Sequence, residues 1–275
     1  MISHLKLLLF FTFALFLLDP AVTPAKELTF DLDHTLYDTV LKEFVKEGLV
    51  DYAELQKNPH SLNRYLTDLS QVKEPVFEGW EKNQQLAYLI NLYNAATLKL
   101  IVNHYPVERI KDIGGFFKGP WSQPVVKLFG DSITLNTLEH GIIRTDYDEL
   151  RIHLALVCAA KGCAPLRGEA YTAEKLDAQL DDQGRLFLSK PLKFQIDRPH
   201  HTVYLSPIFK WYGKDFTRQF TPESGFKKLS KTERAVLNFC SRYLCDPDSQ
   251  FLAAGGYSVR YLDYDWSLNE RKAKQ

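Results

Sequence analysis

The spacing of apolar residues predicts several helices along the chain. Apolar positions recur every three or four residues in 36–45, 61–69 and 84–103, which is typical of helices with a buried face. The last of these is apolar on most sides and stops before Tyr105-Pro106, so we expect a central, largely buried helix. Further helices are expected at 138–144, with Asn136 as N-cap, at 172–188 and at 208–216.

Other segments have the pattern of strands. Residues 125–129 and 132–135 flank Gly130-Asp131 and predict a hairpin, and 203–205 and 257–265 also favour strands. The nearly continuous apolar run 152–158 predicts a buried strand. Helices and strands intermix without a strict repeat, so we expect an α+β fold: a single domain with a central buried helix and further helices on a small, mostly antiparallel sheet.

Composition and charge narrow the class of partner. The chain has 275 residues, 45% of them hydrophobic, and no repeat or change in composition that would separate a second domain from 26–275. Its 34 basic and 34 acidic residues cancel, and no block of lysine and arginine stands out. We therefore expect a peptide, glycan or small-molecule partner, and neither nucleic acid nor an anionic membrane.

Residues 1–25 have the pattern of a secretory signal peptide. Lys6 precedes the uncharged apolar stretch 7–18, and Thr23-Pro24-Ala25 offers small residues at a cleavage point. Twelve apolar residues fall short of the roughly 20 that span a bilayer. We expect a periplasmic or secreted protein without a stable membrane span after cleavage.

The four cysteines form two local pairs, Cys158 with Cys163 and Cys240 with Cys245. In an oxidising compartment both pairs are candidate disulfides. Cys240 and Cys245 lie in a helical pattern, where a staple at the helix end is the simplest interpretation. Cys158 leaves its apolar run at Ala159-Ala160-Lys161-Gly162, where backbone amides and a lysine would favour a thiolate. It is a candidate nucleophile, a buried apolar residue or half of a disulfide.

Candidate partners for a nucleophilic Cys158 occur just upstream. On an extended strand His153 would lie roughly 16 Å from Cys158 and on the opposite face, which makes His140 the better candidate base. Glu139 is a candidate orienting carboxylate, although Asn136-x-x-Glu139 also resembles a capping box. Adjacent helical residues diverge, so a catalytic Glu139 would more readily meet His153 than His140.

Three polar residues are candidates for binding charge that develops during a reaction. Asn91 and Asn94 share one face of the expected central helix, where each amide either anchors the fold or stabilises an oxyanion. Arg144 follows His140 by one helical turn. Cys158-x4-Cys163 is looser than the usual zinc spacing, and the Gly114-Gly115 loop lacks the lysine of a phosphate loop. Neither metal nor cofactor is expected.

The sequence resembles the bacterial family called domain of unknown function 547. The resemblance is carried by seven segments: 85–95, 113–117, 138–144, 151–158, 163–167, 209–212 and 264–269. Tyr88 and Ala164 depart from the family pattern, which usually has tryptophan or phenylalanine near the first and proline at the second.

The resemblance implies a fold similar to papain-like thiol hydrolases, with a Glu/His/Cys constellation on Glu139, His140 or His153, and Cys158. It favours a nucleophilic Cys158 over a bridged one. The leading hypothesis is an exported thiol hydrolase or acyl transferase, in which Arg144 or an asparagine amide stabilises charge. The alternative is a non-catalytic envelope protein that binds a partner through Phe116 to Trp121, with a Cys158–Cys163 disulfide.

Overall fold

The computed structural model describes residues 30–115 and 118–272, so the expected signal peptide lies outside the described residues. Its helices are α1 (Thr35–Phe44), α2 (Tyr52–Lys57), α3 (His60–Ser70), α4 (Glu74–Glu78), α5 (Lys82–His104), α6 (Arg144–Asp146), α7 (Leu176–Leu188), α8 (Pro207–Tyr212), α9 (Thr217–Phe220), α10 (Lys231–Ser241) and α11 (Asp246–Ala254). Shorter helical turns are η1 (Ile110–Asp112), η2 (Pro120–Ser122), η3 (Thr137–Ile143) and η4 (Leu150–Leu154), and the strands are β1 (Val45–Lys46), β2 (Leu49–Val50), β3 (Val126–Leu128), β4 (Asp131–Ile133), β5 (Phe194–Asp197), β6 (Thr202–Leu205) and β7 (Ser258–Tyr261).

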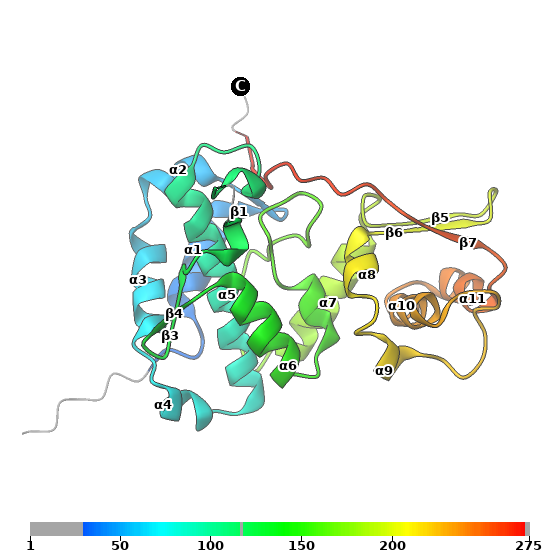
Figure 1. Ribbon diagram of the computed structural model, residues 1–275, viewed down its shortest axis with the longest axis horizontal. Coiled ribbons are helices and arrows are strands. Elements are labelled where there is room, and N and C mark those ends of the chain that lie inside the picture. Colours follow the sequence, from blue (N-terminus) through cyan, green and yellow to red (C-terminus); the bar gives the residue numbers. More distant parts are fainter. Residues whose placement is uncertain (1–29, 116–117, 273–275) are drawn as a thin grey trace, which may run out of the picture.

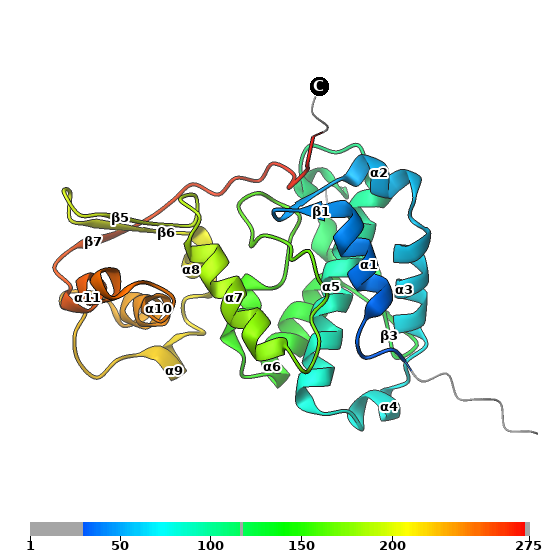
Figure 2. The same ribbon diagram turned by 180° about the vertical axis from the view of Figure 1, so that it is seen from behind.

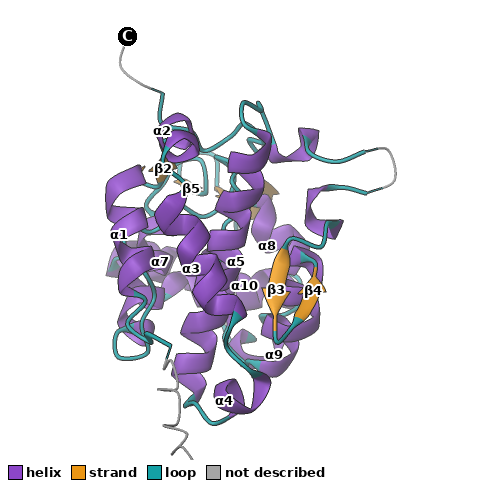
Figure 3. Ribbon diagram, turned by 90° about the vertical axis from the view of Figure 1, so that its left-hand side faces the viewer, coloured by secondary structure: helices purple, strands orange, loops and turns teal. Residues whose placement is uncertain are grey.

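The expected mixture of helices and short strands is confirmed, but the strands do not form one sheet. β1–β2 and β3–β4 are separate antiparallel hairpins, and the third sheet has the order β5–β6–β7. In that sheet β5 pairs with β6 antiparallel, whereas β7 pairs with β6 in parallel register, Val203 opposite Val259. The β3–β4 hairpin lies at the edge of the helical body (Figure 3).

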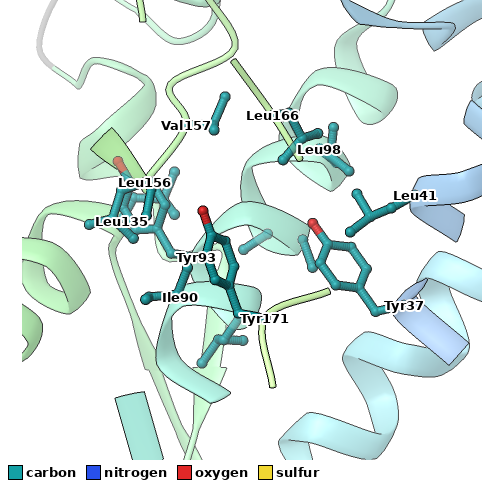
Figure 4. Close-up of a cluster of buried hydrophobic side chains, with 14 of the residues drawn as sticks. Tyr37, Leu41, Ile90, Tyr93, Leu98, Leu135, Leu156, Val157, Leu166 and Tyr171 are labelled. Carbon is teal, nitrogen blue, oxygen red and sulfur yellow. The ribbon is translucent and has the colours of Figure 1, made fainter. Parts of the chain in front are cut away.

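Helices α1 to α6 gather at one end of the molecule, while the three-stranded sheet and α8 to α11 form the other end (Figure 1). Each end has its own hydrophobic cluster. In the first, side chains from α1, α5 and residues 135–171 pack together, as Figure 4 shows for Tyr37, Tyr93, Leu156 and Tyr171. No helix of the described residues is long and apolar enough to cross a membrane.

The central helix begins and ends almost as expected, because local chemistry defines its start. At the beginning of α5 the Glu81 and Gln84 side chains satisfy each other's backbone N–H groups in a capping box. Seventeen of its 23 residues are buried. Helices α1 and α3 likewise agree with the predicted spans to within about two residues.

The strand predicted at 152–158 is wrong. The segment starts in the short helix η4 and continues as irregular chain. The Asn94 side chain on α5 makes the backbone hydrogen bonds that a neighbouring strand would make in a sheet. Its amide donates to the carbonyl of Ala155 at 3.0 Å and accepts from the N–H of Val157 at 2.9 Å. An apolar run can therefore be buried without a sheet when a side chain satisfies its backbone.

A long C-terminal stretch connects the two ends of the molecule. After β7 it runs back across the molecule to the helical end (Figures 1 and 2). There Leu268 N–H donates to Glu108, Asn269 N–H to Ala159 and Arg271 N–H to Val50, each to the backbone carbonyl at 2.8–3.0 Å. This path carries residues 264–266 past the loop that follows Cys158.

Candidate functional site

The four candidate catalytic residues meet at one cavity of about 360 Å³. Its walls come from α5, η2, η3, residues 153–163, α8 and the C-terminal stretch. Four of the residues proposed from the sequence line it, namely Glu139, His140, His153 and Cys158, as does Cys163. The other lining residues are Tyr93, Trp121, Asn136, Leu156, Ile208, Trp211, Tyr212, Tyr264 and Trp266.

Glu139 and His140 lie on η3, a short π-helix. Such helices are rare and occur frequently at functional sites. The capping-box interpretation of Asn136 and Glu139 is wrong, because the Asn136 side chain makes no cap hydrogen bond and Glu139 is buried instead.

Cys158 lies at the start of a strained loop. Its side chain is half-buried, and the next residue, Ala159, has a positive φ of 55°. A non-glycine residue in this region costs about 1 kcal/mol or more, and such strain is concentrated at active sites and ligand clamps. The conformation turns the chain toward Cys163.

The hydroxyl of Tyr264 lies 3.0 Å from the Cys158 sulfur. The tyrosine ring packs directly against Gly162, where a β-carbon would lie 2.7 Å from a ring carbon. Backbone hydrogen bonds from Lys161 N–H to the Ser267 carbonyl and from Gly162 N–H to the Asp265 carbonyl hold the loop after Cys158 against the C-terminal stretch. Glycine at 162 is therefore required for Tyr264 to reach the sulfur.

Cys158 and Cys163 are free thiols that interact with each other. The backbone N–H of Cys158 donates to the Cys163 sulfur at 3.1 Å. Hydrogen bonds from the Cys158 thiol and N–H lower the pKa of Cys163, and the same pairing with Cys163, together with burial, raises the pKa of Cys158. The first proton of the pair is therefore easier to remove than the second.

The lysine beside this pair is Lys193, not Lys161 as expected. Lys161 is exposed, whereas Lys193 is 3% exposed and its ammonium donates to the Lys161 carbonyl. Burial lowers the pKa of Lys193 to about 8, against the opposing influence of the two nearby thiols. Nothing in the local sequence marks Lys193, because it lies 30 residues beyond Cys163.

His153 is paired with a carboxylate that the sequence did not reveal. Its Nε2 lies 2.9 Å from Oδ2 of Asp215, and its ring stacks on Tyr212 with centroids 4.3 Å apart. The hydrogen bond from His153, with those from Arg144, lowers the pKa of Asp215 to about 2. An ionised carboxylate only accepts hydrogen bonds, so Nε2 carries the proton and Nδ1 has the free lone pair.

His140 has the opposite arrangement. Its Nδ1 lies 2.9 Å from Nη1 of Arg144, and Nη2 of the same guanidinium donates to Asp215 at 2.7 Å. A guanidinium has only donors, so Nδ1 accepts and the proton of the neutral ring is on Nε2. The lone pair that a base needs is thus already engaged by Arg144.

Glu139 does not orient either histidine by a hydrogen bond. Its two oxygens accept from the hydroxyls of Tyr93 and Tyr212, each at 2.9 Å, and the nearest His140 nitrogen is 3.8 Å away. Burial and the adjacent Glu139 carboxylate raise the pKa of both tyrosines, which therefore remain donors. Glu139 fixes Tyr212, on which His153 stacks.

Asn91 and Asn94 do not line the cavity. Asn91 exchanges two hydrogen bonds with the backbone of Tyr171, at 2.7 and 3.0 Å, as Asn94 does with Ala155 and Val157. Both side chains are at most 2% exposed. These contacts favour buried anchoring over stabilisation of an oxyanion.

Neither sulfur–imidazole contact expected from the sequence is formed. Among the described residues, the side chain whose oxygen lies within hydrogen-bond distance of the Cys158 sulfur is Tyr264. The rings of His140 and His153 lie on the wall of the same cavity. Asp215, Tyr264 and Lys193 were missed because they come from segments 30 to 106 residues away from their partners. The cluster Tyr264-Asp265-Trp266 was the one usable signal.

A second cavity of about 350 Å³ lies between α7 and α10. Arg151 forms ion pairs there with Glu149, Asp177 and Asp181, each at 2.7 Å. The guanidinium is saturated by these carboxylates, so this cavity offers a structural ion-pair network and no comparable nucleophile.

Comparison with known proteins identifies one domain. Residues 77–188 match the family described as "Protein of unknown function, DUF547", which is the family that the sequence resembles. The match includes η3, η4 and both Cys158 and Cys163, and it stops before Trp211, Asp215 and Tyr264. The curated proteins gave no match. The solved structures gave none either, so the expected likeness to papain-like hydrolases has no support.

Proposed function

We propose that the chain is a thiol-dependent hydrolase or acyl transferase, with Cys158 as nucleophile and His153 as base. The observation that carries the proposal is the His153–Asp215 pair on the wall of the cavity that holds Cys158. A carboxylate bound to one ring nitrogen fixes the tautomer whose other nitrogen accepts a proton, which is the arrangement found in nucleophilic catalysis. Asp215 takes the orienting role that the sequence suggested for Glu139.

The proposed reaction proceeds through a thioester. The Cys158 sulfur attacks the acyl carbon of an ester or amide, and its proton passes to His153 Nδ1 directly or through one water as the substrate closes the gap. The bond to the leaving group then breaks, and the leaving group takes the proton from His153. Water hydrolyses the thioester, or a second acceptor removes the acyl group, and the thiol is restored.

Tyr264 and Arg144 assist in different ways. The Tyr264 hydroxyl lies 3.0 Å from the sulfur, where it donates to a developing thiolate. Arg144 holds Asp215 with its Nε at 3.0 Å and Nη2 at 2.7 Å. Arg144 is therefore a positioning residue, since it acts on His153 through Asp215.

The proposal is tested with p-nitrophenyl acetate as acyl donor and peptide mapping of the acetylated site. We expect acetyl on Cys158, formed about 10²–10⁴-fold more slowly in His153→Gln, because general-base catalysis contributes about that much. Asp215→Asn should also slow the reaction, whereas His104→Gln, an exposed histidine on α5, should not. Equal acetylation of Cys158 in the wild type and in His153→Gln would refute the proposed base.

The second candidate function is a binding protein with Cys158 and Cys163 bridged. The contact between the two cysteines and the aromatic cavity wall favour it. Its expected binding loop includes Phe116 and Phe117, which lie outside the described residues, and Trp121, which lines the cavity. Mass spectrometry of freshly isolated protein without reductant separates the candidates, because a quantitative Cys158–Cys163 bridge would favour the binding protein.

We also propose that the protein is exported from the cell. This proposal rests on the basic, apolar and small-residue segments of 1–25, and N-terminal sequencing of the protein from its natural host would test it. We expect the mature chain to begin near residue 26, and a chain that retains residues 1–25 would contradict cleavage.

A further inference from the structure

Four aromatic residues from three separate segments meet at one side of the cavity. Trp121 comes from η2, Trp211 from α8, and Tyr264 and Trp266 from the C-terminal stretch. Ring centroids are 4.4 Å apart for Tyr264 and Trp266, 4.9 Å for Trp211 and Tyr264, 5.9 Å for Trp211 and Trp266, and 6.2 Å for Trp121 and Trp266. We call these four residues the aromatic platform.

One member of the platform is exposed to solvent, and the other three are half-buried. Trp211 is 49% exposed and is one of few large apolar side chains on the surface of the described residues. Aromatic side chains that line a cavity and keep part of their apolar surface in contact with water are typical of binding sites. Lys111 places its ammonium 3.4 Å from the ring centroid of Trp266, which holds that ring in position.

The polar groups of the cavity select an uncharged ligand. Glu139 is its lining carboxylate, and both oxygens already accept from tyrosines. The Arg144 guanidinium is engaged by Asp215 and His140. The exposed amide of Asn136 at the wall donates one N–H to the Ser122 hydroxyl at 3.3 Å, which leaves its oxygen to accept from a ligand hydroxyl. A ligand with an apolar face and hydroxyls along its edge satisfies this combination of aromatic faces and neutral polar groups.

We propose that the aromatic platform binds a pyranose ring of a saccharide and presents an acyl group on that saccharide to Cys158. A pyranose has C–H groups on its face, which pack on aromatic rings, and hydroxyls at its edge. Tyr264 joins the two parts of the site, since its ring belongs to the platform and its hydroxyl lies 3.0 Å from the sulfur. A sugar stacked on the platform is thereby placed next to the nucleophile.

The acyl half of this inference rests on the proposed function, and the binding half does not. In the acyl step the Cys158 sulfur bonds to the acyl carbon, the bond from that carbon to the sugar oxygen breaks, and the proton held by His153 goes to the sugar oxygen. The products are a thioester and a free saccharide. Water then releases the acid and restores the thiol.

Intrinsic fluorescence tests the binding half in Cys158→Ser, which cannot form the thioester. Three of the four tryptophans belong to the platform, so a bound sugar should shift the emission. We expect saturable shifts with at least one of cellotetraose, chitotetraose and maltotetraose, and about three- to tenfold weaker binding in Trp211→Ala, as expected for one lost aromatic contact. Trp211→Phe, which keeps a ring, should retain most of the affinity.

Trp80 supplies the matched control, because it packs against Phe77 and Tyr88 away from the platform. Trp80→Phe should bind the tetrasaccharides as the parent does. Binding of N-acetyl-phenylalaninamide in place of any saccharide would overturn the sugar assignment in favour of an aromatic peptide group, and no shift with any probe would overturn the platform as a ligand site.

An O-acetylated cellotetraose added to the unmodified protein tests the acyl half. Acetyl on Cys158, lost in Trp211→Ala at limiting probe, is the expected result. Saccharide binding without acetylation would support the platform as a sugar site and refute the thiol chemistry. Acetylation by p-nitrophenyl acetate without saccharide binding would support the thiol chemistry and refute the platform as a sugar site.

Discussion

Cys158 and Cys163 are separated by four residues, as are Cys240 and Cys245. The two pairs differ in their exposure and in the groups that contact their sulfurs. The first pair lines a cavity, with a backbone N–H on one sulfur and a tyrosine hydroxyl on the other. In the second pair Cys240 is fully buried in α10, while Cys245 is exposed beyond its end.

The difference lies in the backbone between the cysteines. A turn with a positive φ at Ala159 brings Cys158 and Cys163 together, whereas the end of α10 separates Cys240 from Cys245. Cys245 donates to Asp248 at 3.3 Å instead, and burial raises the pKa of Cys240. Sequence spacing alone therefore predicts neither a disulfide nor a reactive thiol.

The largest expected effect is the loss of acyl transfer in Cys158→Ala. Removal of the attacking atom should reduce acetylation and turnover of p-nitrophenyl acetate by about 10³-fold or more, because Cys163, the other thiol on the cavity wall, is buried and its sulfur accepts the N–H of residue 158. Cys245→Ala should retain the rate of the parent. Stopped-flow release of p-nitrophenol measures both, and comparable rates in the two variants would remove the distinction between the pairs.

The second effect concerns stability and should be confined to the other pair. Cys240→Ser places a hydroxyl among apolar side chains and should lower the free energy of unfolding by about 1–2 kcal/mol. Cys245→Ser, at an exposed position, should change it by less than about 0.5 kcal/mol. Urea titrations provide the comparison, and equal midpoints would mean that Cys240 does not act as a core residue.

The third effect is selective oxidation. With oxidised glutathione, a thiolate of the first pair attacks the disulfide and releases one glutathione thiol, and the second cysteine then displaces the other. We expect a Cys158–Cys163 bridge and at least about tenfold slower alkylation of Cys158. A Cys240–Cys245 bridge should not form under the same conditions, and peptide mapping that found it first would contradict the assignment.

The smallest expected effect comes from Tyr264→Phe. The hydrogen bond from Tyr264 lowers the pKa of Cys158, against the larger upward influences of Cys163 and burial. Without it the pKa should rise, so the iodoacetamide rate profile should move to higher pH and the rate at pH 8 should fall about threefold. Tyr204→Phe, on β6, is the control, and a profile shifted to lower pH would give Tyr264 the opposite role.

The sequence predicted those elements whose stability is local. Helices α1, α3 and α5 carry their own apolar periodicity, and α5 also carries its capping box, so their spans could be predicted. The segment 152–158 could not, because its conformation depends on two hydrogen bonds from Asn94, more than 60 residues away. An apolar run shows that a segment is buried, and not how its backbone is satisfied.

In the candidate site, too, the residues could be predicted from the sequence but their contacts could not. Glu139, His140, His153 and Cys158 were found because they are close in sequence, and they do share one cavity. Their connections were not predictable, since His153 binds Asp215 and Glu139 binds Tyr93 and Tyr212, contacts made only by tertiary packing. Even the choice between the two histidines needed the positions of Arg144 and Asp215.

The path of residues 262–271 has a consequence for the order of assembly. Protein synthesis proceeds from the N-terminus, so Cys158 and Cys163 are made about a hundred residues before Tyr264 and Trp266. Until those two aromatic residues emerge, the paired thiols lack one wall of their enclosure. A nascent chain that stalled before residue 264 would hold its sulfurs open to solvent, and only the late arrival of this stretch would close them in.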